Sequence, residues 1–129
     1  MRKILFRGKR IDNGEWVEGY PVKYPSGKVE IFKECEEPPD ILLKCEIDPQ
    51  TICQYTDLKD KKDNRIWEND IVRIENSMDE GIGNIKFCGG MWYVDGKPNN
   101  SLYDIVEYDE ADVEVIGNVL DNPELLKGE

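Results

Sequence analysis

The side chains that could do chemistry in this chain are mainly carboxylates and thiols. Its 129 residues include 28 Asp and Glu, four Cys and no His. Without imidazole, Ser-His and Cys-His dyads are excluded, and general acid–base work would fall to carboxylates, lysine or tyrosine. With 28 carboxylates in the chain, composition alone does not identify a catalytic pair. We therefore predict that the protein is not an enzyme and uses no cofactor, with a carboxylate-dependent enzyme as the least favoured alternative.

The densest charge lies in "TDLKDKKDNRIWENDIVRI", residues 56–74. A calcium loop needs oxygen ligands at alternating positions, but lysines occupy them whether the loop is started at Asp57 or at Asp60. "DKKDNR" is instead typical of a hairpin tip, in which Asp and Asn form the turn. Trp67 and Ile71 would then anchor the following strand in the core. The alternative is a recognition loop whose carboxylates contact a partner: Asp60, Glu68 and Asp70.

The four cysteines do not indicate a metal site. Cys35, Cys45, Cys53 and Cys88 form no closely spaced pair of the kind that zinc sites use. We expect free thiols, mostly buried, and no metal.

Two further clusters have both a functional and a structural interpretation. Trp92 and Tyr93 are adjacent, so on a strand one faces the core and the other solvent, where it could stack on a partner. The carboxylates Asp109, Glu110, Asp112 and Glu114 could bind a cation, although a solvated strand edge is the ordinary explanation.

Alternation of apolar and polar residues predicts a mostly β protein. "KILFRGKRI", "EWVEGYPVKY" and "KVEIF" form an antiparallel meander separated by turns at 12–14 and 25–27. Strands then follow in "DIVRIE", "GIGNIKF", "GGMWYVDG", "YDIVEY" and "DVEVIGNV", with a hairpin turn expected at the glycines of "EGIGN". These five suggest a small SH3-like β-barrel, and "NPELL" predicts a short C-terminal helical turn. Residues 38–39 are two prolines and favour a loop, whereas "DILLKCEI" could be a strand or a helical turn.

Length, hydropathy and charge restrict the class of protein. We expect one domain over residues 1–129, with a meander over 1–55 and the barrel over 56–129 as its parts. No apolar run is longer than four residues, so neither a membrane span nor a signal peptide is expected, and we predict a cytoplasmic protein. Residues 1–10 carry five basic side chains, whereas the remainder carries 12 basic and 28 acidic ones. Nucleic acid is therefore an unfavoured partner.

Three blocks resemble the YopX family of phage and prophage proteins. The first, "ILFRGKRIDNGEWVEGY", is similar to the family's I-x-F-R followed by G-x-W-V-x-G. The second, "IDPQTICQYTDLKDKKDNRIWENDIVRI", is similar to D-P-x-T-x-x-Q-Y-T-G-L-x-D-K and then I-[YW]-E-G-D-I-V. The third is "EVIGNVLDNPELL". Cys53, Asp57 and Asn69 stand where the family commonly has glycine, and Asp and Asn are the better substitutes at positive φ.

The resemblance implies a mostly β fold, a mobile-element setting in a host bacterial cytosol and self-assembly, and it supplies no catalytic residue. The favoured hypothesis is a non-enzymatic module that binds another phage or host protein or forms a homo-oligomer. The runner-up is a nucleic-acid-associated SH3-like module, supported by the basic N-terminus and exposed aromatic residues. In a homo-oligomer, the basic N-terminal strand would pair with a neighbouring copy through Ile4 and Phe6.

Overall fold

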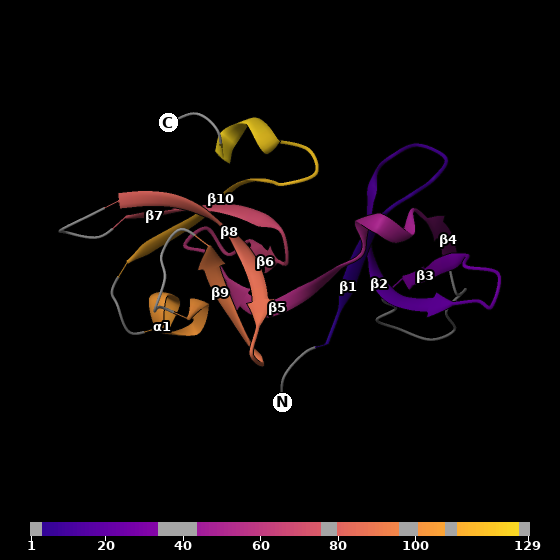
Figure 1. Ribbon diagram of the computed structural model, residues 1–129, viewed down its shortest axis with the longest axis horizontal. Coiled ribbons are helices and arrows are strands. Elements are labelled where there is room, and N and C mark those ends of the chain that lie inside the picture. The colour runs from indigo at the N-terminus through magenta and orange to yellow at the C-terminus, as the bar shows by residue number, and fades with distance from the viewer. Residues whose placement is uncertain (1–3, 34–43, 76–79, 96–100, 108–110, 127–129) are drawn as a thin grey trace. The chain divides into compact units, whose positions relative to one another are not determined.

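The computed structural model describes residues 4–33, 44–75, 80–95, 101–107 and 111–126 (Figure 1). Its backbone is mostly β, in a six-stranded sheet of order β4-β3-β2-β1-β5-β6 and a four-stranded sheet of order β10-β7-β8-β9. The chain divides into two compact units, which we call unit 1 (Met1–Tyr55) and unit 2 (Thr56–Glu129). None of the described helices is long and apolar enough to cross a membrane.

Unit 1 is the predicted antiparallel meander. It consists of β1 (Phe6–Lys9), β2 (Trp16–Lys23), β3 (Val29–Lys33) and β4 (Lys44–Ile47), each paired with the next. Gly14 (φ 74°) and Gly27 (φ 94°) lie in the β1–β2 and β2–β3 connections, where glycine adopts a left-handed backbone without strain. The segment "DILLKCEI" was predicted as a strand or a helical turn, and its described part, "KCEI", is a strand. The loop predicted at the two prolines lies outside the described residues.

The two ends of this meander meet. Arg10, just after β1, forms an isolated antiparallel bridge with Ile47 of β4. The Ile11 N–H donates to the Glu46 carbonyl at 3.1 Å, and the Asp48 N–H donates to the Lys9 carbonyl at 2.9 Å. The sheet thus curls around an aliphatic cluster. That cluster consists of Val17, Val29, Ile31 and Ile47, with Cys45 and Ile52 packed against it.

A short 3₁₀ helix and one strand lead from unit 1 into unit 2. The helix η1 (Pro49–Thr51) begins after Asp48, whose carboxylate accepts the Gln50 N–H at 3.0 Å. The strand β5 (Cys53–Lys59) then crosses the boundary between the units. Its first residues pair with β1, through Arg7↔Cys53 and Phe6↔Gln54, and its neighbour on the other side is β6 (Arg65–Trp67).

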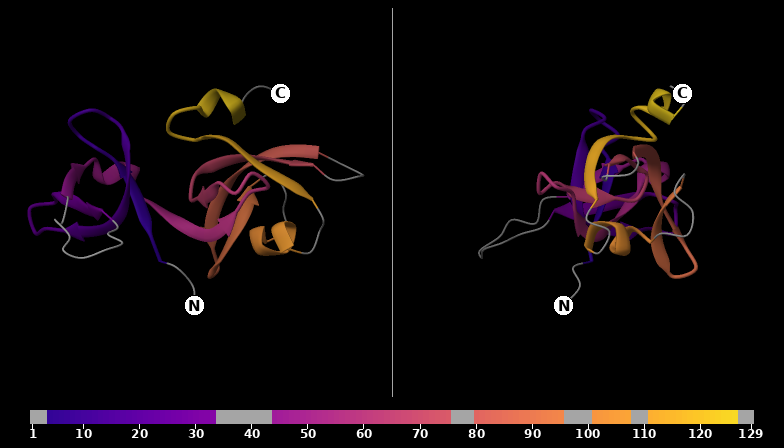
Figure 2. Two further views of the ribbon diagram at one scale, coloured as in Figure 1. Left: turned by 180° about the vertical axis from the view of Figure 1, so that it is seen from behind. Right: turned by 90° about the vertical axis from the view of Figure 1, so that its left-hand side faces the viewer.

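Unit 2 contains the second sheet and its own core. β7 (Asp70–Glu75) pairs with β8 (Glu80–Cys88) and β10 (Asp112–Asn118), and β8 pairs with β9 (Met91–Asp95). The helix α1 (Leu102–Glu107) lies beside β9 in the views of Figures 1 and 2. Buried side chains of β6 to β10 and of α1 form the core: Ile66, Val72, Ile74, Ile85, Trp92, Val94, Leu102, Ile105 and Val113.

Several details of the sequence interpretation are confirmed. Residues 61–63 form the turn between β5 and β6, and Trp67 and Ile71 are buried. Asp57 (φ 66°) and Asn69 (φ 71°) adopt the left-handed backbone expected from the glycines that the family prefers there. The C-terminal turn is the 3₁₀ helix η2 (Pro123–Leu126), with Pro123 at its first position.

Two predicted elements were wrong. "YDIVEY" was expected to be a strand, but its described part lies in α1, where Leu102 and Ile105 are three residues apart on one buried face. The glycines of "EGIGN" lie inside β8 and not in a turn. Gly83 is there because a Cβ would lie 2.2 Å from the Asp95 carbonyl oxygen on the neighbouring strand.

The predicted barrel needed correction. Among the described residues, β9 and β10 are the two edges of the second sheet and do not pair with each other. The second sheet is therefore open in this part of the chain, and the SH3-like barrel predicted from the sequence is not formed there. At the N-terminus the inward side chain is Leu5, which is fully buried, whereas Ile4 is 58% exposed. Ile4 and Leu5 thus face opposite ways, as the alternation of the segment predicts.

Candidate functional site

Asp60 holds the β5–β6 turn to the second sheet of its own unit. Its carboxylate accepts the backbone N–H groups of Lys62 (2.9 Å), Asn64 (2.8 Å) and Val115 (2.9 Å). Burial by itself raises the pKa of Asp60, but these backbone donors outweigh it and hold the pKa below its ordinary value. The side chain is 7% exposed. Asp60 is therefore placed to fix the turn and not to contact a partner.

Glu68 and Asp70 lie in the turn between β6 and β7 and at the start of β7. Asp70 is 2% exposed, and its carboxylate accepts the Trp67 backbone N–H at 2.8 Å. Glu68 is half-buried. The structure therefore does not gather Asp60, Glu68 and Asp70 into one exposed acidic surface, because two of the three are buried among backbone donors.

Trp92 and Tyr93 lie on opposite faces of β9, as the alternation of a strand requires. Trp92 is in the core and its ring contacts Phe87, with centroids 4.8 Å apart. Tyr93 is half-buried and pairs with Lys86 across the ladder. Of the acidic cluster, Glu114 forms an ion pair with Lys62 at 2.6 Å, and Asp109 and Glu110 lie outside the described residues.

A surface that the sequence interpretation missed lies on unit 1. Residues at alternate positions of β2 share one face of the sheet: Trp16, Glu18, Tyr20 and Val22. The register places Phe32 of β3 opposite Tyr20, and residues directly opposite lie on the same face. Tyr24 extends this face, because its hydroxyl donates to the Glu30 carboxylate at 2.5 Å. We call the surface formed by Trp16, Tyr20, Val22, Tyr24 and Phe32 the aromatic face.

The aromatic face has charged groups along both margins. On the β1 side, the Arg7 guanidinium lies 4.3 Å and the Lys9 ammonium 5.4 Å from the Trp16 ring centroid, within the range of cation–π attraction. On the other side, Glu30 accepts from Tyr24 and forms ion pairs with Lys28 and Lys44, both at 3.6 Å. The Tyr24 hydrogen bond is the main cause of a lowered pKa for Glu30.

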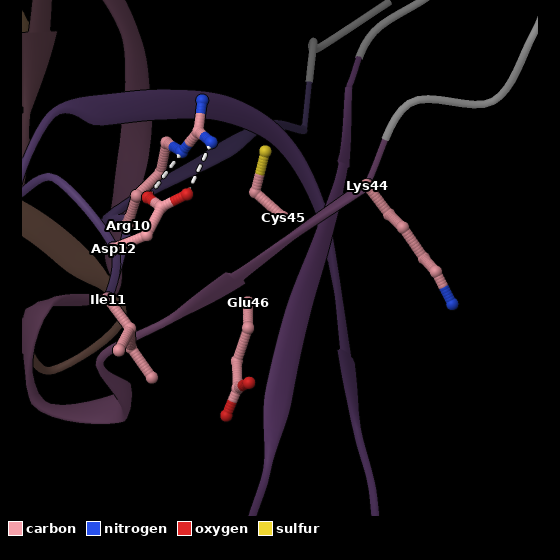
Figure 3. Close-up of a pocket in the computed structure, with 6 residues that line it drawn as sticks. All are labelled: Arg10, Ile11, Asp12, Lys44, Cys45 and Glu46. Atoms are coloured by element: carbon pink, nitrogen blue, oxygen red, sulfur yellow. Dashed lines mark hydrogen bonds and ion pairs between the residues drawn. The ribbon is translucent and has the colours of Figure 1, made fainter.

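Two hollows flank the point at which β4 meets the β1–β2 turn. The first, of about 290 Å³, is lined by Arg10, Ile11, Asp12, Lys44, Cys45 and Glu46 (Figure 3). Arg10 and Asp12 form a two-pronged ion pair at 2.9 and 2.7 Å, which lowers the pKa of Asp12. In Figure 3 the Cys45 thiol points towards this pair, whereas Lys44 and Glu46 point away. The second hollow, of about 380 Å³, is lined by Lys9, Arg10, Ile11, Gly14, Asp48 and Pro49.

The described residues include three free cysteines and no cluster of metal ligands. Among them, Cys, Asp and Glu side chains form no group of three or more that could hold a metal ion. Cys45, Cys53 and Cys88 are free thiols, half-buried, buried and exposed in that order, and Cys35 lies outside the described residues.

Comparison with known proteins identifies the family. The model of the YopX protein family matches residues 5–127, so the chain belongs to the YopX family. It is similar to the SPbeta prophage-derived uncharacterized protein YopX of Bacillus subtilis (strain 168), with 39% identity over 70 residues. That match covers 49% of this chain and 51% of the relative, so it spans about half of the length of each.

A solved structure has the same fold. The crystal structure of protein EF1440 from Enterococcus faecalis superposes with a TM-score of 0.66 and covers 98% of this chain and 99% of that chain. Its sequence identity is 23%, so the likeness concerns the fold alone.

Proposed function

We propose that this YopX-family protein is a non-enzymatic binding module that recognises another protein through the aromatic face of unit 1. One observation carries the proposal. Four of the six aromatic residues of unit 1 lie on the outer face of its sheet, whereas the described core beneath is built of aliphatic side chains and a cysteine. A small domain ordinarily buries its large aromatic side chains, because they contribute the most to a core.

The composition of this surface suits a protein partner. Tyr, Trp and Arg are the residues most enriched at the centres of protein interfaces, and all three types occur here. Tyr20 is 46% and Val22 is 40% exposed, and the margins carry both signs of charge. Covering the exposed parts of these two side chains would contribute about 1.5 to 3 kcal/mol, with the polar rim setting orientation.

The alternative is a β module that associates with nucleic acid. The stacking of Arg7 and Lys9 on Trp16 favours it, because such pairs also bind single strands. Charge opposes it: unit 1 has nine basic and ten acidic side chains, and unit 2 has eight and eighteen. Lys28 and Lys44 both form ion pairs with Glu30, whose single charge offsets one of their two positive charges. Too few phosphates can be neutralised, so fluorescence anisotropy should show no binding to random duplex DNA at physiological salt.

The proposed setting is the cytosol of a bacterium that carries the prophage, and the partner is a phage or host protein or a second copy of this chain. The YopX membership and the prophage-derived relative support that setting. Binding through the basic N-terminal strand is less well supported, because Leu5 is buried in the same chain and Phe6 and Arg7 already pair with β2 and β5.

Site-specific photo-cross-linking in the bacterial cell tests the proposal. A photoreactive phenylalanine derivative replaces Tyr20, and the matched control carries it at Ser26, which is exposed in the turn beyond β2. We expect a discrete protease-sensitive adduct from position 20 that is absent at position 26 and is lost when Val22→Glu is added. Equal labelling from both positions would refute the proposal. An adduct that nuclease removes would favour the nucleic-acid alternative.

A further inference from the structure

The turn between β8 and β9 is an apolar projection on an acidic unit. Residues 87–94, "FCGGMWYV", contain no charged side chain, whereas unit 2 as a whole has a net charge of −10. Phe87 is 51% and Met91 is 52% exposed, and Cys88 between them is also exposed. We call Phe87–Met91 the apolar tip.

The apolar tip is the end of the β8–β9 hairpin. Cys88 pairs with Met91 at the end of the ladder, and Gly89 (φ 62°) and Gly90 (φ 85°) make the turn between them. Phe87 rests on the ring of Trp92, which is buried in the core, although half of its own surface stays exposed. The ladder pair and the ring contact restrain the base of the tip, which reduces the conformational entropy lost when a partner covers it.

The 380 Å³ hollow of unit 1 has a complementary character. Ile11, Gly14 and Pro49 supply its apolar lining, and Ile11 is 58% exposed. The charged groups around it are engaged by neighbours in unit 1. The Arg10 guanidinium is bonded to Asp12, and the Asp48 carboxylate accepts the Gln50 N–H. The Lys9 ammonium lies over Trp16. A hollow of this size is within the range that holds one or two large side chains, and this lining selects an uncharged occupant.

We propose that the apolar tip of one copy binds in the 380 Å³ hollow of a second copy. The charge distribution selects unit 1 as the receiving surface. Contact between two copies of unit 2 would bring together two bodies of net charge −10, whereas unit 1 has a net charge of −1. The tip itself brings no charge into the contact, and at its base Lys86 and Asp95 neutralise each other at 3.1 Å.

This contact joins two different surfaces and is therefore heterologous. Each copy uses its tip on one neighbour and its hollow on another, so the assembly is a closed ring or an open chain and not a two-fold dimer. The tip and the hollow contain none of the five residues that define the aromatic face, although Lys9 borders both the hollow and that face. The inference is thus independent of the proposed function, and cross-linking at position 20 and self-association can fail separately.

Two surface variants test the inference, each placed at a side chain that is more than half exposed. Met91→Glu disables the tip without removing the Phe87–Trp92 contact, and Ile11→Glu disables the hollow. Sedimentation velocity over about 10 to 200 μM, the range expected for a contact of modest area, measures assembly. We expect the wild-type chain to exceed its monomer mass of 14.9 kDa and each variant to remain monomeric.

Mixing the two variants is the decisive measurement. The Ile11→Glu chain keeps a working tip and the Met91→Glu chain keeps a working hollow, so the mixture should form a one-to-one dimer and nothing larger. Tyr103→Glu, at an equally exposed site on α1, is the matched control and should assemble like the wild type. A monomeric wild type, an Ile11→Glu variant that still assembles, or a mixture that stays monomeric would each overturn the inference.

Discussion

Replacing Asp60 by asparagine should destabilise the protein by about 2 to 4 kcal/mol. The substitution conserves volume but exchanges one acceptor oxygen for an NH₂ group. With the remaining oxygen directed at the Lys62 and Asn64 N–H groups, the half-buried Val115 N–H meets a donor, which costs about 1 to 3 kcal/mol. Loss of the charge weakens the other two hydrogen bonds as well, since those to a carboxylate are stronger than neutral ones.

The same carboxylate predicts a dependence of stability on pH. The pKa of Asp60 in the folded protein is held below its ordinary value. A lowered pKa adds stability that is fully present above the pKa of the unfolded chain, about 3.9, and is lost as the pH falls through the folded value. The stability difference between the wild type and Asp60→Asn should therefore be constant near neutrality and shrink below about pH 4.

Urea unfolding followed by tryptophan fluorescence measures both effects, because Trp67 and Trp92 are buried in unit 2. Asp63→Asn is the matched control in the same turn. Asp63 is exposed, its ion pair with Lys59 lies at the surface at 3.6 Å, and asparagine tolerates its φ of 67°. We expect that control to stay within about 0.5 kcal/mol of the wild type. Equal unfolding free energies for the two variants at pH 7 would refute the structural role assigned to Asp60.

Three further predictions concern other parts of the fold. Gly83→Ala places a methyl group 2.2 Å from the Asp95 carbonyl oxygen and should cost at least about 2 kcal/mol in urea unfolding; a smaller loss would contradict the β8–β9 register. Asp57→Gly should leave the melting temperature unchanged or raised, whereas Asp57→Ala should lower it, because φ is 66° there; the reverse order would exclude that backbone. Tyr24→Phe removes a donor from Glu30, so a carbon-detected NMR titration should show the Glu30 pKa rising, and an unchanged value would exclude the hydrogen bond.

The strands with strict alternation could be predicted from sequence alone. In β2 and β3, apolar residues on the core side alternate with larger or polar ones outside, and turns with glycine separate the strands. Prediction failed where two periodicities coexist. "YDIVEY" alternates, but Leu102 and Ile105 also have helical spacing, and burial of that pair against the second sheet decided the outcome. The glycines of "EGIGN" predicted a turn, but Gly83 lies within β8, where the backbone of the neighbouring strand leaves no room for a side chain.

The candidate surfaces were harder to find. The sequence does not show whether a carboxylate contacts a partner or accepts hydrogen bonds from its own backbone. For Asp60 and Asp70 the structure shows the second role, because backbone N–H groups donate to both. The aromatic face did have a signal, since Trp16, Tyr20, Val22 and Tyr24 stand at alternate positions. Which side of β2 faces solvent depends on what packs against Val17, and its cluster includes Ile47 of β4, a strand much later in the chain.

Strand β5 contributes residues to both units, so the two units share one strand. Cys53 and Gln54 complete the sheet of unit 1 at β1, and the same strand continues into unit 2 beside β6. A chain cut after Tyr55 would leave unit 2 without the start of its first strand, and a cut before Cys53 would remove the neighbour of β1. Exchange of either half between related chains is therefore harder than exchange of the whole chain, since every junction within the strand makes a hybrid whose ladder must match on both sides.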